Sequence, residues 1–304
     1  MNLANSAMRR YLFLGGVGLA LVCGSRLIAQ QPDTATGKVS RDQLREPMGH
    51  SNHGDERVAT RTENQIANTP PGHPLDPAIK MANECLAHIG NDIKDYTATI
   101  HKHEQVDGKL QERQQIFVKM RHEPFSAYLY FLGPNSVKGR ECIYVAGKNN
   151  GNLCAHDTGI KGLIRVNLDP NGALAMQGQR YPITKIGFLN LAKELVERAE
   201  QDKKAEAPEN CVLKFLNDAK IGSRACTGVE LSHEIQRPGQ RFQRAVVCVD
   251  KQLGIPIHYT AWDWPSQKGG KPELLEEYTY SNIKLNVGLT DKDFDPDNKE
   301  YHFP

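Results

Sequence analysis

The sequence predicts an α+β protein with one large, curved antiparallel sheet, an incomplete barrel, and about two helices packed on or in it. About ten runs of β-branched and aromatic residues recur along the chain, whereas only two stretches have helical periodicity. Short turns rich in Gly, Pro and Asn separate the runs, so consecutive strands are expected to pair antiparallel. A sheet of this size normally curls or closes.

The first 73 residues are expected to precede the folded domain. Arg9 and Arg10 stand before an apolar run at 11–23, which predicts a signal peptide over residues 1–29. The run is shorter than the roughly 20 residues of a spanning helix, although an uncleaved signal stays an alternative. The arginine pair also fits a partial twin-arginine signal beside an ordinary secretory one. The protein is therefore predicted to be exported to the periplasm or cell envelope, or secreted.

Residues 30–73 contain hardly any large apolar side chain, which predicts a disordered linker. The remaining residues, 74–304, are expected to form a single domain that begins with an amphipathic helix. Asp76 is expected to cap this helix, and Ile79, Leu86 and Ile89 recur at helical spacing until Gly90.

An antiparallel meander is predicted for residues 96–132, and the other elements follow it. Asp107-Gly108 is a hairpin signal, and Pro124 separates the second and third strands of the meander. Further strands are expected over 141–146, 152–156, 163–168, 211–216, 225–235, 242–249, 256–264 and 274–285, with a second helix over 183–200 and a charged loop over 202–209.

Six cysteines follow the predicted signal: Cys85, Cys142, Cys154, Cys211, Cys226 and Cys248. An even number is compatible with disulfides in an oxidising compartment. Spacing about single turns favours Cys142 with Cys154, and either Cys226 with Cys248 or Cys211 with Cys226. Buried free thiols are the alternative interpretation, because no C-x-x-C motif is present.

Charge and motifs point away from nucleic acid and from known catalysis. The net charge is only +2, and the chain has no G-x-S-x-G motif or phosphate-binding glycine loop, so we expect no cofactor and nominate no catalytic residue. His101 and His103 would share one strand face and are weak metal-ligand candidates, with His156 or His233 as a third ligand. A solvated strand face is the preferred interpretation.

Aromatic and aliphatic side chains on the predicted strands either fill the interior of the sheet or line a cavity for an apolar ligand. The candidates for such a cavity are Ile116, Val118, Met120, Tyr128, Leu129, Phe131, Trp262, Trp264, Tyr278 and Tyr280.

Three runs of residues carry a resemblance to a known family. They are KMRHEPFSAYLYF at 119–131, GRECIYV at 139–145 and LLEEYTYSNIKLNVGLTDKDFDPDN at 274–298. Over residues 74–303 the chain resembles a family of exported bacterial proteins, the domain of unknown function 1571. It is more remotely similar to the LolA/LolB class of periplasmic lipoprotein carriers, and Asn286, Leu289 and Phe294 form the strongest shared motif.

The resemblance implies a LolA-like incomplete barrel lidded by helices. It also implies a non-enzymatic carrier or binding domain for a lipid, acyl chain or lipoprotein, with an envelope protein as a further partner. An envelope scaffold with a filled barrel is the first alternative, and an enzyme or metal-binding protein is the second.

Overall fold

The structure is a computed structural model that describes residues 72–205, 210–238, 240–267 and 269–304. The predicted signal peptide and nearly all of the predicted linker lie outside these residues. Within the described part, one sheet contains twelve strands. Its hydrogen-bonded neighbouring strands run antiparallel. The sheet is open, with β7 at one edge and β8 at the other. The predicted α+β class with a large antiparallel sheet is confirmed.

The strand order is β7-β6-β5-β4-β3-β1-β12-β11-β10-β9-β8, and β2 pairs with β1. The first group comprises β1 (Asp95–Val106), β2 (Lys109–Leu110), β3 (Gln114–Arg121), β4 (Ser126–Gly133), β5 (Glu141–Val145), β6 (Leu153–His156) and β7 (Val166–Leu168). The second group comprises β8 (Cys211–Ile221), β9 (Arg224–His233), β10 (Arg244–Asp250), β11 (Pro256–Asp263) and β12 (Glu273–Leu285). Each group is a meander, and the pairing of β1 with β12 joins the two.

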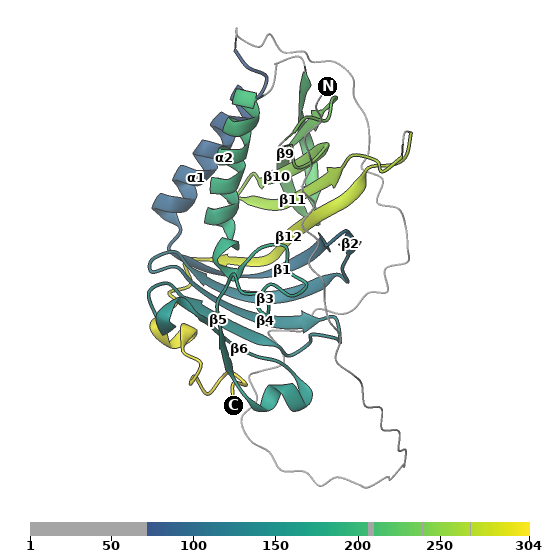
Figure 1. The fold of residues 1–304 in the computed structure, drawn as a ribbon. Helices are drawn as coiled ribbons and strands as arrows, with labels where there is room; N and C mark the ends of the chain where they lie inside the picture. Colours follow the sequence, from purple (N-terminus) through teal and green to yellow (C-terminus); the bar gives the residue numbers. More distant parts are fainter. Residues whose placement is uncertain (1–71, 206–209, 239, 268) are drawn as a thin grey trace, which may run out of the picture. The chain divides into compact units, whose positions relative to one another are not determined.

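Two α-helices lie side by side, α1 (Asp76–Asp92) and α2 (Phe188–Ala205) (Figure 1). Helix α1 passes Gly90, where the sequence predicted its end, and stops two residues later. Helix α2 starts later than predicted, because Ile183–Lys185 form a separate 3-10 turn and Gly187 has a positive φ of 97°. It also ends later, so the first part of the predicted charged loop is helical. No helix in the described residues combines the length and apolar character needed to cross a membrane.

The main core lies between the sheet and the helices. Tyr96 is at its centre, stacked on Phe188 with ring centroids 4.3 Å apart, and Val118 and Met120 are buried in the same cluster. A second cluster lies on the other face of β4 and β5, where Phe294 from the C-terminal 3-10 turn η6 (Asp291–Phe294) is buried. Strand β4 is therefore covered on both faces, which explains its continuous apolar run.

The described cysteines are not joined in disulfides, and the strand register explains why the predicted pairs do not form. Cys142 lies opposite Ala155 while Cys154 lies opposite Ile143, so the two thiols point to opposite faces. Cys226 and Cys248 are diagonal neighbours, offset by two residues, which places their Cβ atoms about 7 Å apart where a disulfide requires about 4 Å.

Cys211 and Cys226, the remaining predicted pair, form no disulfide because they lie at opposite ends of the β8–β9 hairpin. Cys211 pairs with His233, whereas Cys226 pairs with Ala219 near the turn. Burial raises the pKa of Cys85 to about 11 and that of Cys248 to about 12, so these thiols stay protonated near neutral pH. The structure agrees with the alternative interpretation of unbridged thiols, five of them buried and Cys142 partly exposed.

The weak metal candidates do not come together. His101 and His103 alternate along β1 with Ile100, Lys102 and Glu104, so they face the other side of the sheet. Strand β6, which carries His156, is four strands from β1, or about 19 Å. Among the residues that the structure describes, no group of three His, Cys, Asp or Glu side chains could hold a metal ion.

Candidate functional site

A cavity of about 1190 Å³ lies between one face of the sheet, the two helices and the segment that joins β7 to α2. We name residues 169–187 the cover loop. The cavity wall combines strands from both meanders with α1 and α2, because β1 and β12 meet in the middle of the sheet. The lining residues of the sheet lie almost entirely on one of its two faces, as the two-residue period of a strand leads one to expect.

Most of the lining is apolar. The sheet contributes Ile100, Ile116, Leu129, Phe131, Leu153, Leu168, Leu213, Val229, Leu231, Val247 and Tyr280. The helices contribute Ala78, Met81, Ala82, Cys85, Leu191, Leu195 and Ala199. Such a surface is suited to hydrocarbon, since burying apolar area is favourable and non-directional.

Some of the predicted cavity residues lie on this wall and others do not. Ile116, Leu129, Phe131, Tyr278 and Tyr280 line the cavity. They come from β3, β4 and β12, close to the pairing of β1 with β12 that joins the two meanders.

The other candidates are placed elsewhere. Val118 and Met120 share the face of Ile116, but they lie further along β3, in the core beneath Gly187 and the start of α2. Tyr128 faces the opposite side of the sheet and stacks on Tyr301, with centroids 4.1 Å apart. Trp262 and Trp264 lie outside the lining, and the Arg244 guanidinium packs 3.9 Å from the centroid of the Trp262 ring.

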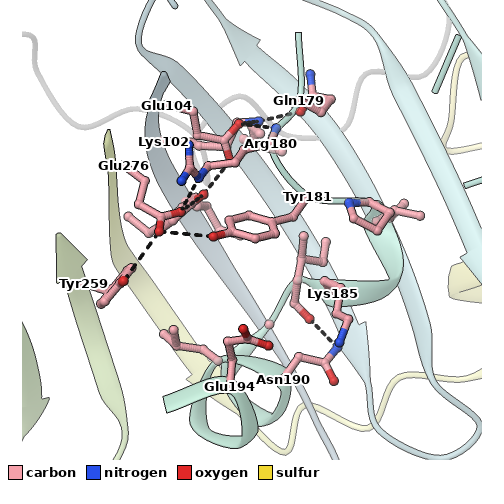
Figure 2. A pocket seen from close by; sticks show the side chains of 18 of the residues that line it. Lys102, Glu104, Gln179, Arg180, Tyr181, Lys185, Asn190, Glu194, Tyr259 and Glu276 are labelled. Atoms are coloured by element: carbon pink, nitrogen blue, oxygen red, sulfur yellow. Dashed lines mark hydrogen bonds and ion pairs between the residues drawn. The ribbon is translucent and has the colours of Figure 1, made fainter. Parts of the chain in front are cut away.

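A group of polar side chains interrupts the apolar wall, and we name it the polar cluster (Figure 2). Its members are Lys102, Glu104, Gln179, Arg180, Tyr181, Tyr259, Glu276 and Tyr278. Glu104 on β1 and Glu276 on β12 lie directly opposite each other in the sheet, and both are buried. Two like charges in that position repel, so the surrounding donors must stabilise them.

Glu104 is held by three donors. Its Oε1 accepts a hydrogen bond from the Tyr278 hydroxyl at 2.5 Å. Its Oε2 accepts from Lys102 Nζ at 3.1 Å and from the backbone N–H of Arg180 at 3.0 Å. This carboxylate thereby ties the cover loop to the sheet.

Glu276 has four partners. Its Oε1 accepts from the hydroxyls of Tyr181 at 3.1 Å and Tyr259 at 3.4 Å. Its Oε2 accepts from the Tyr278 hydroxyl at 3.1 Å and lies 3.3 Å from Arg180 Nε. Burial raises the pKa of Glu276 in spite of Arg180, and burial together with Glu276 raises the pKa of Tyr181 to about 12.

Sequence reasoning did not find the polar cluster, although part of a signal was present. Lys102 and Glu104 follow Ile100 at two-residue spacing, and Glu276 precedes Tyr278 and Tyr280 in the same way. That spacing places charged side chains on a core face. Tyr278 itself was expected only as an apolar liner, whereas its hydroxyl bridges the two carboxylates.

Comparison with known families identifies the domain. A family model described as "Protein of unknown function (DUF1571)" matches residues 93–303. The chain belongs to this family. The family assignment expected from the sequence is thus confirmed. Helix α1 lies outside the matched part of this DUF1571 protein, although its side chains line the cavity.

Several solved structures are distantly similar to the DUF1571 chain. Lipoprotein LppX of Mycobacterium tuberculosis is 13% identical, with a TM-score of 0.39, over 71% of this chain and 98% of that one. MucB in the MucA/MucB complex of Pseudomonas aeruginosa is 15% identical, with a TM-score of 0.39, over 72% and 60%. A LolA superfamily protein of Nitrosomonas europaea is 10% identical, with a TM-score of 0.30, over 71% and 96%. No curated protein sequence matches.

Proposed function

We propose that this protein is an exported, non-enzymatic binding or carrier domain that holds a lipid, an acyl chain or the acyl group of a lipoprotein in its cavity. The observation that carries the proposal is the cavity itself. Protein interiors are normally close-packed, and ligand pockets measure about 300–1,000 Å³, so a mainly apolar space of about 1190 Å³ indicates a ligand site.

The polar cluster supports a binding role over a catalytic one. Glu104 and Glu276 accept hydrogen bonds from lysine, arginine and tyrosine donors on four different segments, so both are engaged in holding the wall together. A carboxylate that acts as general base must be within hydrogen-bond reach of a substrate proton, whereas the oxygens of Glu104 and Glu276 accept hydrogen bonds from the protein itself. The basic pair and apolar run near the N-terminus support placement in the periplasm or cell envelope, where a protein partner would deliver or receive the ligand.

Native mass spectrometry of the protein purified from its own envelope fraction, followed by lipid extraction, tests the proposal. We expect a co-purifying lipid, and we expect the delipidated protein to take up a fluorescent fatty acid. Absence of both would overturn the proposed function.

Ile116→Trp places an indole in the cavity and should weaken fatty-acid uptake about tenfold or more, since it removes space that the chain would occupy. Gln115→Trp is the matched control, because Gln115 is the exposed neighbour on the opposite face of β3. Equal uptake by both variants, with both folded by circular dichroism, would place the ligand elsewhere.

A further inference from the structure

The cations of the polar cluster are more exposed than its carboxylates, and all four side chains line the cavity. The side chain of Arg180 is 25% exposed and that of Glu276 is 6% exposed. Lys102 is 12% exposed, whereas Glu104 is 4% exposed. The guanidinium and the ammonium are therefore more accessible to a polar group in the cavity than either carboxylate.

The carboxylates also have little capacity left to accept hydrogen bonds. A carboxylate has about four lone-pair sites. Glu276 faces Tyr181, Tyr259 and Arg180 at three of these, and at the fourth it faces the Tyr278 hydroxyl, whose single proton it shares with Glu104. Glu104 accepts three hydrogen bonds, one of them from the backbone of the cover loop. The cluster is therefore poor in acceptors for a cationic or hydroxyl ligand.

Its cations retain donors. A guanidinium has about five N–H groups and an ammonium has about three. Arg180 uses Nε toward Glu276 and one terminal nitrogen toward the carbonyl of Gln105 at 3.1 Å. Lys102 donates to Glu104 and to the side-chain oxygen of Gln179. Spare N–H groups on both residues favour a ligand that accepts hydrogen bonds and carries negative charge.

A proton on the cluster would strengthen this preference. The Tyr278 hydroxyl has one proton for two carboxylates, Glu104 at 2.5 Å and Glu276 at 3.1 Å. Burial raises the pKa of Glu276, so Glu276 is favoured to take up a proton when a second anion comes close. Neutral Glu276 leaves the charge of Arg180 to the incoming anion.

We propose that Lys102 and Arg180 form a subsite for the anionic end group of an amphiphile, a carboxylate or a phosphate monoester, whose hydrocarbon chain lies along the apolar wall. This subsite rests on the proposed function and names the class of ligand. It lies where the apolar side chains Ile100 and Tyr280 give way to the polar cluster along β1 and β12. One amphiphile can thus contact both zones.

The test measures displacement of a neutral fluorescent dye from delipidated protein by four amphiphiles of equal chain length. These are an alkyl carboxylate, an alkyl phosphate, an alkyl alcohol and an alkyltrimethylammonium. We expect the two anions to bind about tenfold or more tightly than the alcohol, as one charge-assisted hydrogen bond provides. Inorganic phosphate alone should not displace the dye, and displacement at equal concentration would assign the site to free phosphate and overturn the proposal.

Lys102→Gln and Arg180→Gln should each weaken binding of the anions more than binding of the alcohol, and so remove most of the anion preference. Arg113→Gln is the matched control, since Arg113 is an exposed base paired with Glu277 outside the cavity. Where a glutamine variant does not fold, Lys102→Arg and Arg180→Lys keep the charge and should retain the preference. Loss of the preference in these charge-retaining variants would contradict the subsite.

Failure of the subsite and failure of the proposed function give different results. An alcohol or ammonium that competes as well as the carboxylate overturns the subsite and leaves lipid binding in place. If no amphiphile displaces the dye, the proposed function fails together with the subsite.

Discussion

At the scale of single residues, Asp250 closes the turn between β10 and β11. Its side chain is buried, and its Oδ1 accepts the backbone N–H groups of Gln252 at 2.9 Å and Leu253 at 2.7 Å. Its Oδ2 is paired with Arg224 Nε. Burial opposes the charged form, but Arg224 and the two N–H groups outweigh it and lower the pKa of Asp250 below its usual 3.8.

Asp250→Asn should therefore lower the free energy of unfolding by about 1–3 kcal/mol near neutral pH, because the bond to a charged partner is lost. A carboxylate with a depressed folded-state pKa contributes stability above its unfolded pKa and loses it as pH falls through the folded value. Urea unfolding at several pH values should show the variant approaching wild type in acid. The exposed Asp218→Asn serves as control, and a pH-independent difference would exclude the carboxylate as its source.

For single residues, the sequence could predict which face of the sheet a side chain lies on, because that follows from the two-residue period of a strand. Ile116, Leu129 and Phe131 were predicted to share the inner face of the sheet, either in a filled core or at a cavity, and all three lie on the face that lines the cavity. The hydrogen bond from the backbone N–H of Arg180 to Glu104 could not be predicted, because the two residues lie 76 positions apart in the sequence. Contacts that depend on such loops follow from tertiary structure and leave no local pattern.

At the scale of elements, the start of α2 is set by a close approach between the chain and the sheet. The backbone N–H of Phe188 donates to the Tyr96 hydroxyl at 3.1 Å, which satisfies one of the free donors of the helix start. A Cβ on Gly187 would lie 2.8 Å from that hydroxyl oxygen and 3.0 Å from Met120 Cε. Glycine is therefore needed at this position for both its positive φ and its lack of a side chain.

Gly187→Ala should lower the free energy of unfolding by about 2–5 kcal/mol, from left-handed strain together with the overlap. Gly178→Ala is the matched control in the cover loop. It also has a positive φ, 67°, but nothing lies within 4 Å of its added Cβ, so about 1–2 kcal/mol is expected. Denaturant unfolding measures both variants, and equal losses would show that the overlap relaxes without cost.

Element positions could be predicted well where turn residues punctuate the chain and poorly where they do not. Asp107 and Gly108 mark the end of β1 correctly, and both have positive φ. The second helix was placed too early because Ile183 and Ile186 extend its apolar period through Gly187. A glycine within a periodic run does not by itself show that the chain changes direction there.

At the scale of the whole described domain, the joint between β1 and β12 unites the two meanders. Ile100 lies opposite Tyr280 in this pairing, and Tyr280 packs against Phe188 with centroids 4.5 Å apart. Antiparallel neighbours could be predicted because short turns connect them. The pairing of β1 with β12 could not be predicted, because no turn or other local sequence pattern connects two strands so far apart in the chain.

A fragment of residues 72–205 should fail to fold cooperatively, although it contains β1 to β7 and both helices. It lacks β12, so β1 would become an unpaired edge and the core would lose Tyr280. Thermal unfolding by circular dichroism, compared with residues 72–304, measures this. A cooperative transition in the fragment would show that the first meander is independently stable.

The same joint sets a delay during synthesis. Residue 273, where β12 begins, is made 178 residues after residue 95, where β1 begins. At roughly 5–20 residues per second this is about 9–36 s in which β1 can pair with β3 but has no β12 on its other side. The sheet therefore stays incomplete until β12 has been translated, and for a protein proposed to be exported, an incompletely folded chain can still pass through a membrane channel in extended form.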